Sequence, residues 1–207
     1  NTTVEDQFNV KIVDFDYNME NNLITFVHDS VRTFVDKLIM AGAGMCHRIF
    51  NQMGKYPIDI MGNYGLQYGE YNAATGELEI KENLTFPCDR ESVDKRVTML
   101  REQFGFTEFA GENVEFHASG CITFPILGTK AKQEDKLAFD PDRSKRRAIY
   151  EDVKQVFSDY VVFVGGSSSF DMAPKPYNKY FALDKYCKEN GIEHSEVVFV
   201  GDDYGLG

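Results

Sequence analysis

Two short apolar runs that end in carboxylates stand out in this sequence, VKIVDFD at residues 10–16 and VVFVGDD at residues 197–203. Both are typical of strands in a parallel sheet, which are buried on both faces and therefore apolar along their length. Ligands of open parallel sheets bind beyond the carboxyl ends of the strands. We therefore expect Asp14, Asp16 and Asp202 to lie at one edge of such a sheet.

The segment between the two runs mixes helical and strand patterns. Apolar residues recur at helical spacing in four stretches, and Gly191, typical of helix C-termini, ends a fifth helix. Other stretches alternate or form brief apolar runs, as strands do. The expected helices cover about residues 31–39, 45–53, 93–104, 149–157 and 178–190, and the expected strands lie at residues 10–13, 58–61, 77–80, 114–116, 121–126, 160–164 and 196–200. This order predicts an α/β core with an α+β insertion.

We predict three segments along the chain. Residues 1–67 would form the first part of the core, residues 68–173 the inserted domain, and residues 174–207 the second part of the core. Because a central parallel strand needs a neighbour on each side, we expect the intact protein to continue beyond residue 207.

The composition argues against several classes of protein. With 33 acidic and 22 basic residues, the net charge of −11 disfavours nucleic acid or an anionic membrane as the main partner. No apolar run approaches the roughly 18 residues that a membrane-spanning helix needs. The four cysteines are scattered, as in the free thiols of a reducing compartment, which predicts a cytoplasmic protein. The oligomeric state is left open.

The carboxylates and a downstream lysine favour phosphate chemistry. Carboxylates gathered at one edge repel one another unless a cation lies between them, and oxygen ligands favour Mg²⁺ over zinc. Lys179, in the first turn of a predicted helix, would reach the same edge and help to bind a phosphate. Asp14 could then attack phosphorus, while Asp16 protonates the leaving oxygen and later activates water. For each residue taken singly, a solvated surface position is the alternative.

The order of these motifs resembles that of the haloacid dehalogenase-like (HAD) phosphatases, in particular the phosphomannomutase and Cof-type sugar-phosphate phosphatases. The stretch DFDYN at residues 14–18 is similar to the first motif, DxDGT, and PKPYNK at residues 174–179 resembles the third, with Lys179 as the phosphate-binding lysine. The start of the fourth motif resembles residues 201–207. The resemblance implies a Rossmann-like core with an inserted C2-type cap, and Asp14, Asp16 and Asp202 as magnesium ligands.

The insertion itself resembles the phosphomannomutase cap. Residues 116–128 are similar to the cap segment that touches sugar phosphate, and residues 165–171 resemble the last cap strand. The resemblance implies that His117, Ser169 and Asp171 lie near the substrate. Ordinary positions in the cap sheet are the alternative for all three. The insertion also holds a basic stretch, for which we favour a solvated helix face over a surface that faces an anionic substrate. Its residues are Lys130, Lys132, Lys145, Arg146 and Arg147.

Some positions depart from the family pattern. Tyr17 and Asn18 replace the Gly and Thr of the first motif, and the second motif has no clear match. His117 and Thr129 replace arginines that phosphomannomutases use to hold a second phosphate, which favours a hydrolase. The predicted function is a Mg²⁺-dependent phosphatase of a small phosphorylated metabolite, such as a sugar phosphate. Phosphomannomutase-type phosphoryl transfer and a catalytically degenerate ligand-binding domain are the alternatives.

Overall fold

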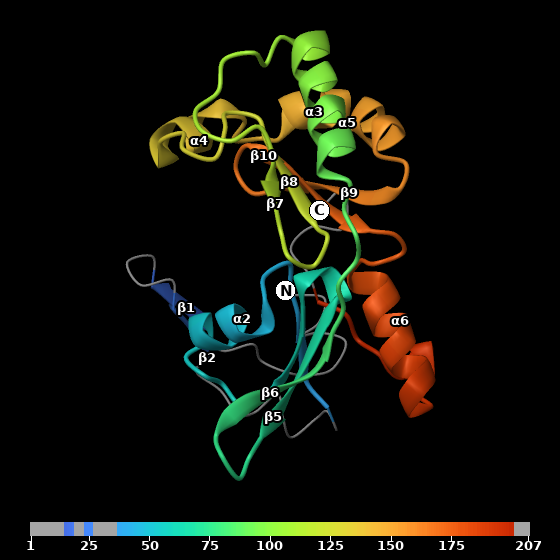
Figure 1. The fold of residues 1–207 in the computed structure, drawn as a ribbon. Helices are drawn as coiled ribbons and strands as arrows, with labels where there is room; N and C mark the ends of the chain where they lie inside the picture. Colours follow the sequence, from blue (N-terminus) through green and yellow to red (C-terminus); the bar gives the residue numbers. More distant parts are fainter. Residues whose placement is uncertain (1–14, 19–22, 27–36, 201–207) are drawn as a thin grey trace. The chain divides into compact units, whose positions relative to one another are not determined.

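The computed structural model describes residues 15–18, 23–26 and 37–200 (Figure 1). The chain divides into two compact units, a first unit within residues 1–83 and a second unit within residues 84–207. The three predicted segments, with boundaries at residues 67 and 173, stay a prediction. The predicted strand at residues 10–13 lies outside the described residues, as do Asp14 and Asp202.

The first unit contains a four-stranded mixed sheet in the order β3-β4-β5-β6. Its strands are β3 (Ile39–Ala41), β4 (Asp59–Gly62), β5 (Gln67–Asn72) and β6 (Glu77–Asn83). Strands β3 and β4 are parallel and are connected through helix α2 (Cys46–Gln52), whereas the other neighbours are antiparallel. The parallel pair with its connecting helix confirms the predicted α/β character in this part of the chain.

One side of this sheet packs against α2 because apolar side chains alternate along its strands. Ile60 and Leu78 from the strands pack with Ile49, Phe50 and Met53 from the helix segment. The predicted strands at residues 58–61 and 77–80 are confirmed by β4 and β6. The predicted helix at residues 31–39 is wrong at its end, because Ile39 begins strand β3 and pairs with Asp59.

Two further short strands belong to the first unit. Strand β1 (Phe15–Asn18) pairs antiparallel with β2 (Leu23–Phe26). Asp16 therefore lies inside a hairpin strand opposite Thr25, rather than just after a strand as the sequence predicted.

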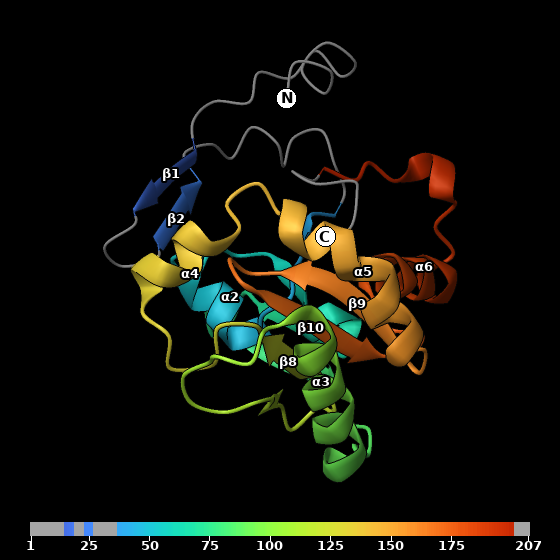
Figure 2. The same cartoon turned by 90° about the horizontal axis from the view of Figure 1, so that it is seen from above.

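The second unit is built on an antiparallel sheet in the order β7-β8-β10-β9. Its strands are β7 (Glu115–Phe116), β8 (Ile122–Pro125), β9 (Tyr160–Gly165) and β10 (Ser169–Pro174). Helices α3 (Arg90–Phe104) and α5 (Ser144–Val156) cover the same face of this sheet (Figures 1 and 2). Helix α4 (Gln133–Phe139) precedes α5. These elements confirm the predicted α+β character of the middle of the chain.

The core of the second unit lies between this sheet and its two helices. Phe170 and Met172 from β10 are fully buried there against residues such as Val97 and Leu100 of α3 and Val153 of α5. Helix α3 begins at the Asp89 cap, whose carboxylate accepts a hydrogen bond from the Ser92 N–H. Because Phe170 and Met172 face the helices, their neighbour Asp171 faces the opposite side.

The end of the described chain consists of helix α6 (Lys179–Asn190), a 3-10 turn (His194–Glu196) and residues 197–200 without regular structure. Helix α6 confirms the predicted helix. The predicted strand at residues 196–200 is wrong, because none of the described strands pairs with it. Val198, Phe199 and Val200 are instead 51%, 46% and 57% exposed. None of the helices in the described residues is long and apolar enough to cross a bilayer.

Candidate functional site

The open face of the second unit's sheet, opposite α3 and α5, carries a row of side chains from all four strands. The strand register aligns Glu115, Thr123, Asp171 and Phe163 across β7, β8, β10 and β9. Residues paired across antiparallel strands point to the same face. The row therefore places two carboxylates and a hydroxyl on the face of the sheet that the helices leave open.

Two polar residues of this row, Thr123 and Asp171, form a hydrogen-bonded chain with His117. The Thr123 hydroxyl donates to Asp171 Oδ1 over 2.9 Å, and His117 Nε2 lies 3.2 Å from Thr123 Oγ1. An ionised carboxylate only accepts hydrogen bonds, so the single hydroxyl proton of Thr123 points to Asp171. Thr123 Oγ1 then accepts from His117, which assigns a proton to His117 Nε2. The structure thus joins two predicted site residues through a third residue, Thr123, which the sequence analysis did not identify.

The strand turn next to Asp171 is shaped by glycine. A Cβ atom at Gly165 would lie 2.0 Å from Asp171 Oδ2, so no other residue fits without displacing that carboxylate. The Ser169 hydroxyl donates to the Gly165 carbonyl over 3.1 Å. Ser169 and Asp171, both predicted near the substrate, therefore lie on the same face of β10 beside Gly165.

The thiol of Cys121 lies near this row but is not suited to nucleophilic chemistry. Burial raises its pKa to about 11, a hydrogen bond with Ser119 opposes this shift, and the charge of Asp171 adds to it. A thiol that stays protonated at neutral pH is a poor nucleophile.

Lys179 is the first residue of helix α6, as the sequence predicted. Asn178 caps this helix, since its side-chain oxygen accepts a hydrogen bond from the Phe181 N–H over 2.7 Å. The ring of Tyr177 packs against Phe86 and Phe181, with centroids 5.4 and 5.2 Å away. These contacts hold the start of α6, where unpaired N–H groups and the positive end of the helix dipole favour an anion.

We expect Asn178→Ala to lower the free energy of unfolding by about 1 kcal/mol, because the Phe181 N–H loses its cap. Urea denaturation of the two proteins measures the difference. Asn178→Asp provides the control, since an aspartate also caps helices and should retain wild-type stability. An equal loss in both variants would contradict this role of the side chain.

The predicted metal ligands are not brought together by the described residues. Asp14 and Asp202 lie outside them, and the backbone of Asp16 lies in β1. Within residues 15–18, 23–26 and 37–200, no group of three or more His, Cys, Asp or Glu side chains is placed to hold a metal ion. A hollow of about 590 Å³ along α5 and β9 is lined by residues such as Tyr150, Lys154 and Lys175, not by a predicted site residue.

Comparison with known families decides the classification. The sequence pattern of the haloacid dehalogenase-like hydrolases matches residues 98–204, slightly more than half of the chain. The chain belongs to this family. The match includes the positions of His117, Ser169, Asp171, Lys179 and Asp202, and it confirms the resemblance seen in the motifs. None of the curated proteins matches the chain by sequence.

The first of two similar solved structures supports the same fold. A phosphatase of the haloalkanoate (HAD) enzyme superfamily from Bacteroides thetaiotaomicron is similar over 81% of this chain and 64% of its own, with 14% identity and a TM-score of 0.50. A trehalose-6-phosphate phosphatase from Aspergillus fumigatus is 18% identical over 77% of this chain and 54% of its own, with a TM-score of 0.36. The chain thus spans less than two thirds of the length of both structures.

Proposed function

We propose that this protein is a Mg²⁺-dependent HAD-type phosphatase that hydrolyses a small phosphorylated metabolite, such as a sugar phosphate. The observation that carries the proposal is the family match over residues 98–204, which includes Lys179 and Asp202. The D-x-D motif at Asp14 and Asp16 lies upstream of the matched region and supplies the two carboxylates that the chemistry needs.

The predicted ligands fit Mg²⁺. Asp14, Asp16 and Asp202 offer only carboxylate oxygens, the donors that Mg²⁺ prefers, whereas zinc sites usually include His or Cys. When bound, the ion would reduce the repulsion among the carboxylates and neutralise charge on the phosphoryl group.

The side chains of the chain itself perform the reaction in two steps. A carboxylate oxygen of Asp14 forms a bond to phosphorus as the ester P–O bond breaks, and Asp16 gives its proton to the leaving oxygen. Asp16 then accepts a proton from a water molecule, whose oxygen attacks phosphorus and frees Asp14 and inorganic phosphate. The Lys179 ammonium and the first turn of α6 stabilise the charge on the transferring group.

The predicted cap over residues 68–173 would supply the contacts to the leaving group. The carboxylate of Asp171, the hydroxyl of Ser169 and the imidazole of His117 can accept from or donate to sugar hydroxyls. Closing the cap over the substrate would also exclude bulk water from the reaction.

A panel of sugar phosphates and other metabolite phosphates tests the proposal with purified full-length protein. We expect phosphate release with Mg²⁺, loss of it after chelation with EDTA, and recovery when Mg²⁺ is restored, because the clustered carboxylates need the cation. Conversion of a hexose 1-phosphate in the presence of a bisphosphate activator, without phosphate release, would favour the phosphomannomutase-type reaction instead.

One observation favours a catalytically degenerate binding domain as a second candidate. The second motif of the family is a Ser or Thr that ends a strand, whereas strand β3 ends at Ala41 and is followed by Gly42. No turnover on any member of the panel, together with a raised melting temperature in the presence of a sugar phosphate, would support this alternative.

A further inference from the structure

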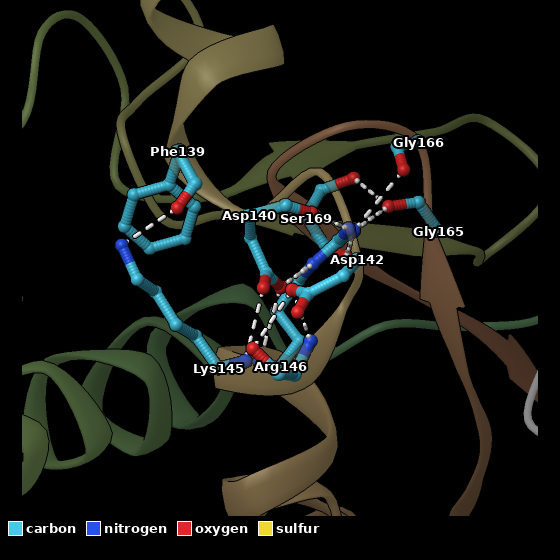
Figure 3. Close-up of polar contacts among 9 residues, drawn as sticks. Phe139, Asp140, Asp142, Lys145, Arg146, Gly165, Gly166 and Ser169 are labelled. Carbon is cyan, nitrogen blue, oxygen red and sulfur yellow. Dashed lines mark hydrogen bonds and ion pairs between the residues drawn. The ribbon is translucent and has the colours of Figure 1, made fainter.

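A buried ion pair connects helix α5 to the segment that precedes it. The side chains of Arg146 and Asp140 are 1% and 0% exposed, and Arg146 Nε donates to Asp140 Oδ2 over 2.8 Å (Figure 3). Asp140 also accepts from the backbone N–H groups of Lys145 and Arg146, at 2.9 and 3.1 Å. Asp140 therefore orients the guanidinium and caps the first turn of α5. This burial corrects the prediction of a solvated face for Arg146.

The other end of the guanidinium holds the turn between β9 and β10. Arg146 Nη1 lies 2.5, 3.1 and 3.2 Å from the carbonyl oxygens of Gly165, Gly166 and Ser169 (Figure 3). Three carbonyl dipoles thus converge on one buried cation. Hydrogen bonds that involve a charged group are about twice as strong as neutral ones, so the turn is held firmly in this conformation.

The same turn determines where the substrate-facing side chains lie. The Gly165 carbonyl accepts from both Arg146 and the Ser169 hydroxyl. The Asp171 carboxylate occupies the space beside Gly165 that a side chain at this position would fill. A displacement of Gly165 would therefore also displace the side chains of Ser169 and Asp171, which lie against it.

We propose that Arg146, oriented by Asp140, is a positioning residue that sets the turn Gly165–Ser169 and thereby places Ser169 and Asp171 against the leaving group of the substrate. This inference rests on the proposed function. It adds two residues to the site that do not touch the substrate. The role requires a guanidinium, because its planar fork reaches Asp140 with one nitrogen and the turn carbonyls with another, which the single ammonium of lysine cannot do.

Arg146→Lys tests this role against two substrates. One is the hexose phosphate that the wild-type protein hydrolyses best, and the other is p-nitrophenyl phosphate, whose leaving group has no hydroxyls for Ser169 and Asp171 to bind. We expect KM for the hexose phosphate to rise about tenfold, as for the loss of a hydrogen bond to a charged group, with kcat nearly unchanged. Both constants for p-nitrophenyl phosphate should stay within about twofold of wild type.

Two controls accompany this variant. Arg147→Lys changes the exposed neighbour of Arg146 on the same helix and should match the wild-type protein in every assay. If Arg146→Lys does not fold, the double variant Asp140→Asn, Arg146→Met replaces it, since removing both charges leaves no unpaired charge in the interior. The double variant should show the same substrate-selective rise in KM.

Backbone amide resonances of residues 165–171 provide a readout that is independent of catalysis. They should move in Arg146→Lys and stay in place in Arg147→Lys. Unmoved resonances, or equal losses on both substrates in a folded variant, would overturn the positioning role. If the wild-type protein releases phosphate from neither substrate, the proposed function fails, and the resonances alone decide whether Arg146 sets the turn.

Discussion

Phosphate release by the Asp14→Asn variant is expected to be at least roughly a thousandfold slower than by the wild-type protein, because removing a catalytic nucleophile typically costs this much or more. The amide oxygen of asparagine carries no negative charge and does not form the acyl-phosphate bond. The substitution also removes one of the three carboxylates proposed to bind Mg²⁺. Single-turnover phosphate release at saturating Mg²⁺ measures the effect.

Asp135→Asn is a suitable control for Asp14→Asn. Asp135 lies on α4, is exposed, and its substitution removes the same charge from the surface of the second unit. This variant should keep the wild-type rate. Circular dichroism should confirm that both variants are folded. If Asp14→Asn retained a tenth or more of the wild-type activity, another residue would have to be the nucleophile.

The largest loss of stability is expected for Asp140→Ala, which should lower the free energy of unfolding by about 3–5 kcal/mol, the usual range for breaking a buried ion pair. The substitution leaves the Arg146 guanidinium charged and without its counter-ion in the interior. It also leaves two N–H groups at the start of α5 without the carboxylate that caps them. Urea denaturation of the wild-type and variant proteins measures the difference.

Asp142→Ala provides a matched control on the same loop. Asp142 is exposed and accepts hydrogen bonds only locally, from the N–H and hydroxyl of Ser144. Its removal should cost about 1 kcal/mol or less, as for a surface cap. Similar losses in Asp140→Ala and Asp142→Ala would show that the buried pair adds little to stability.

The ion pair should also make stability depend on pH. Burial disfavours ionisation of Asp140, but the hydrogen bonds from Arg146 and from the N–H groups of Lys145 and Arg146 outweigh it, so its pKa lies below the ordinary value. A lowered pKa in the folded state stabilises the protein above the unfolded-state pKa, about 3.9 for Asp, and this contribution is lost as the pH falls through the folded-state value. The stability difference between wild type and Asp140→Asn should therefore be constant near neutral pH and shrink below about pH 4.

Features with a local physical cause were predictable from the sequence. Helix α6 follows the predicted range because Asn178 caps its start and Gly191 adopts the left-handed conformation at its end. Strands β7, β8 and β9 of the second unit follow from short apolar runs in the sequence, whereas β10 was expected only from the resemblance of residues 165–171 to the last cap strand. The family motifs were recognisable for a similar reason, since their residues lie within a few positions of one another.

Strand pairing was less predictable because it depends on a partner far along the chain. Residues 39–41 continue a helical pattern of apolar residues, yet pairing with β4 makes them a strand. The apolar run at residues 197–200 has the composition of a strand, but this composition does not show whether another strand pairs with it. The backbone N–H and C=O groups of a strand form hydrogen bonds with a neighbouring strand. The sequence of one run therefore does not show whether that run forms a strand.

The sequence by itself determined the family, the order of its motifs and the helices whose ends carry their own caps, because each depends on residues close together in the chain. The tertiary structure decided which polar side chains meet. Thr123 reaches Asp171 only through the register of β8 and β10, and Arg146 reaches Gly165 only because α5 packs against that sheet. Such contacts join residues 48 and 19 positions apart, and their geometry arises from packing that no local pattern contains.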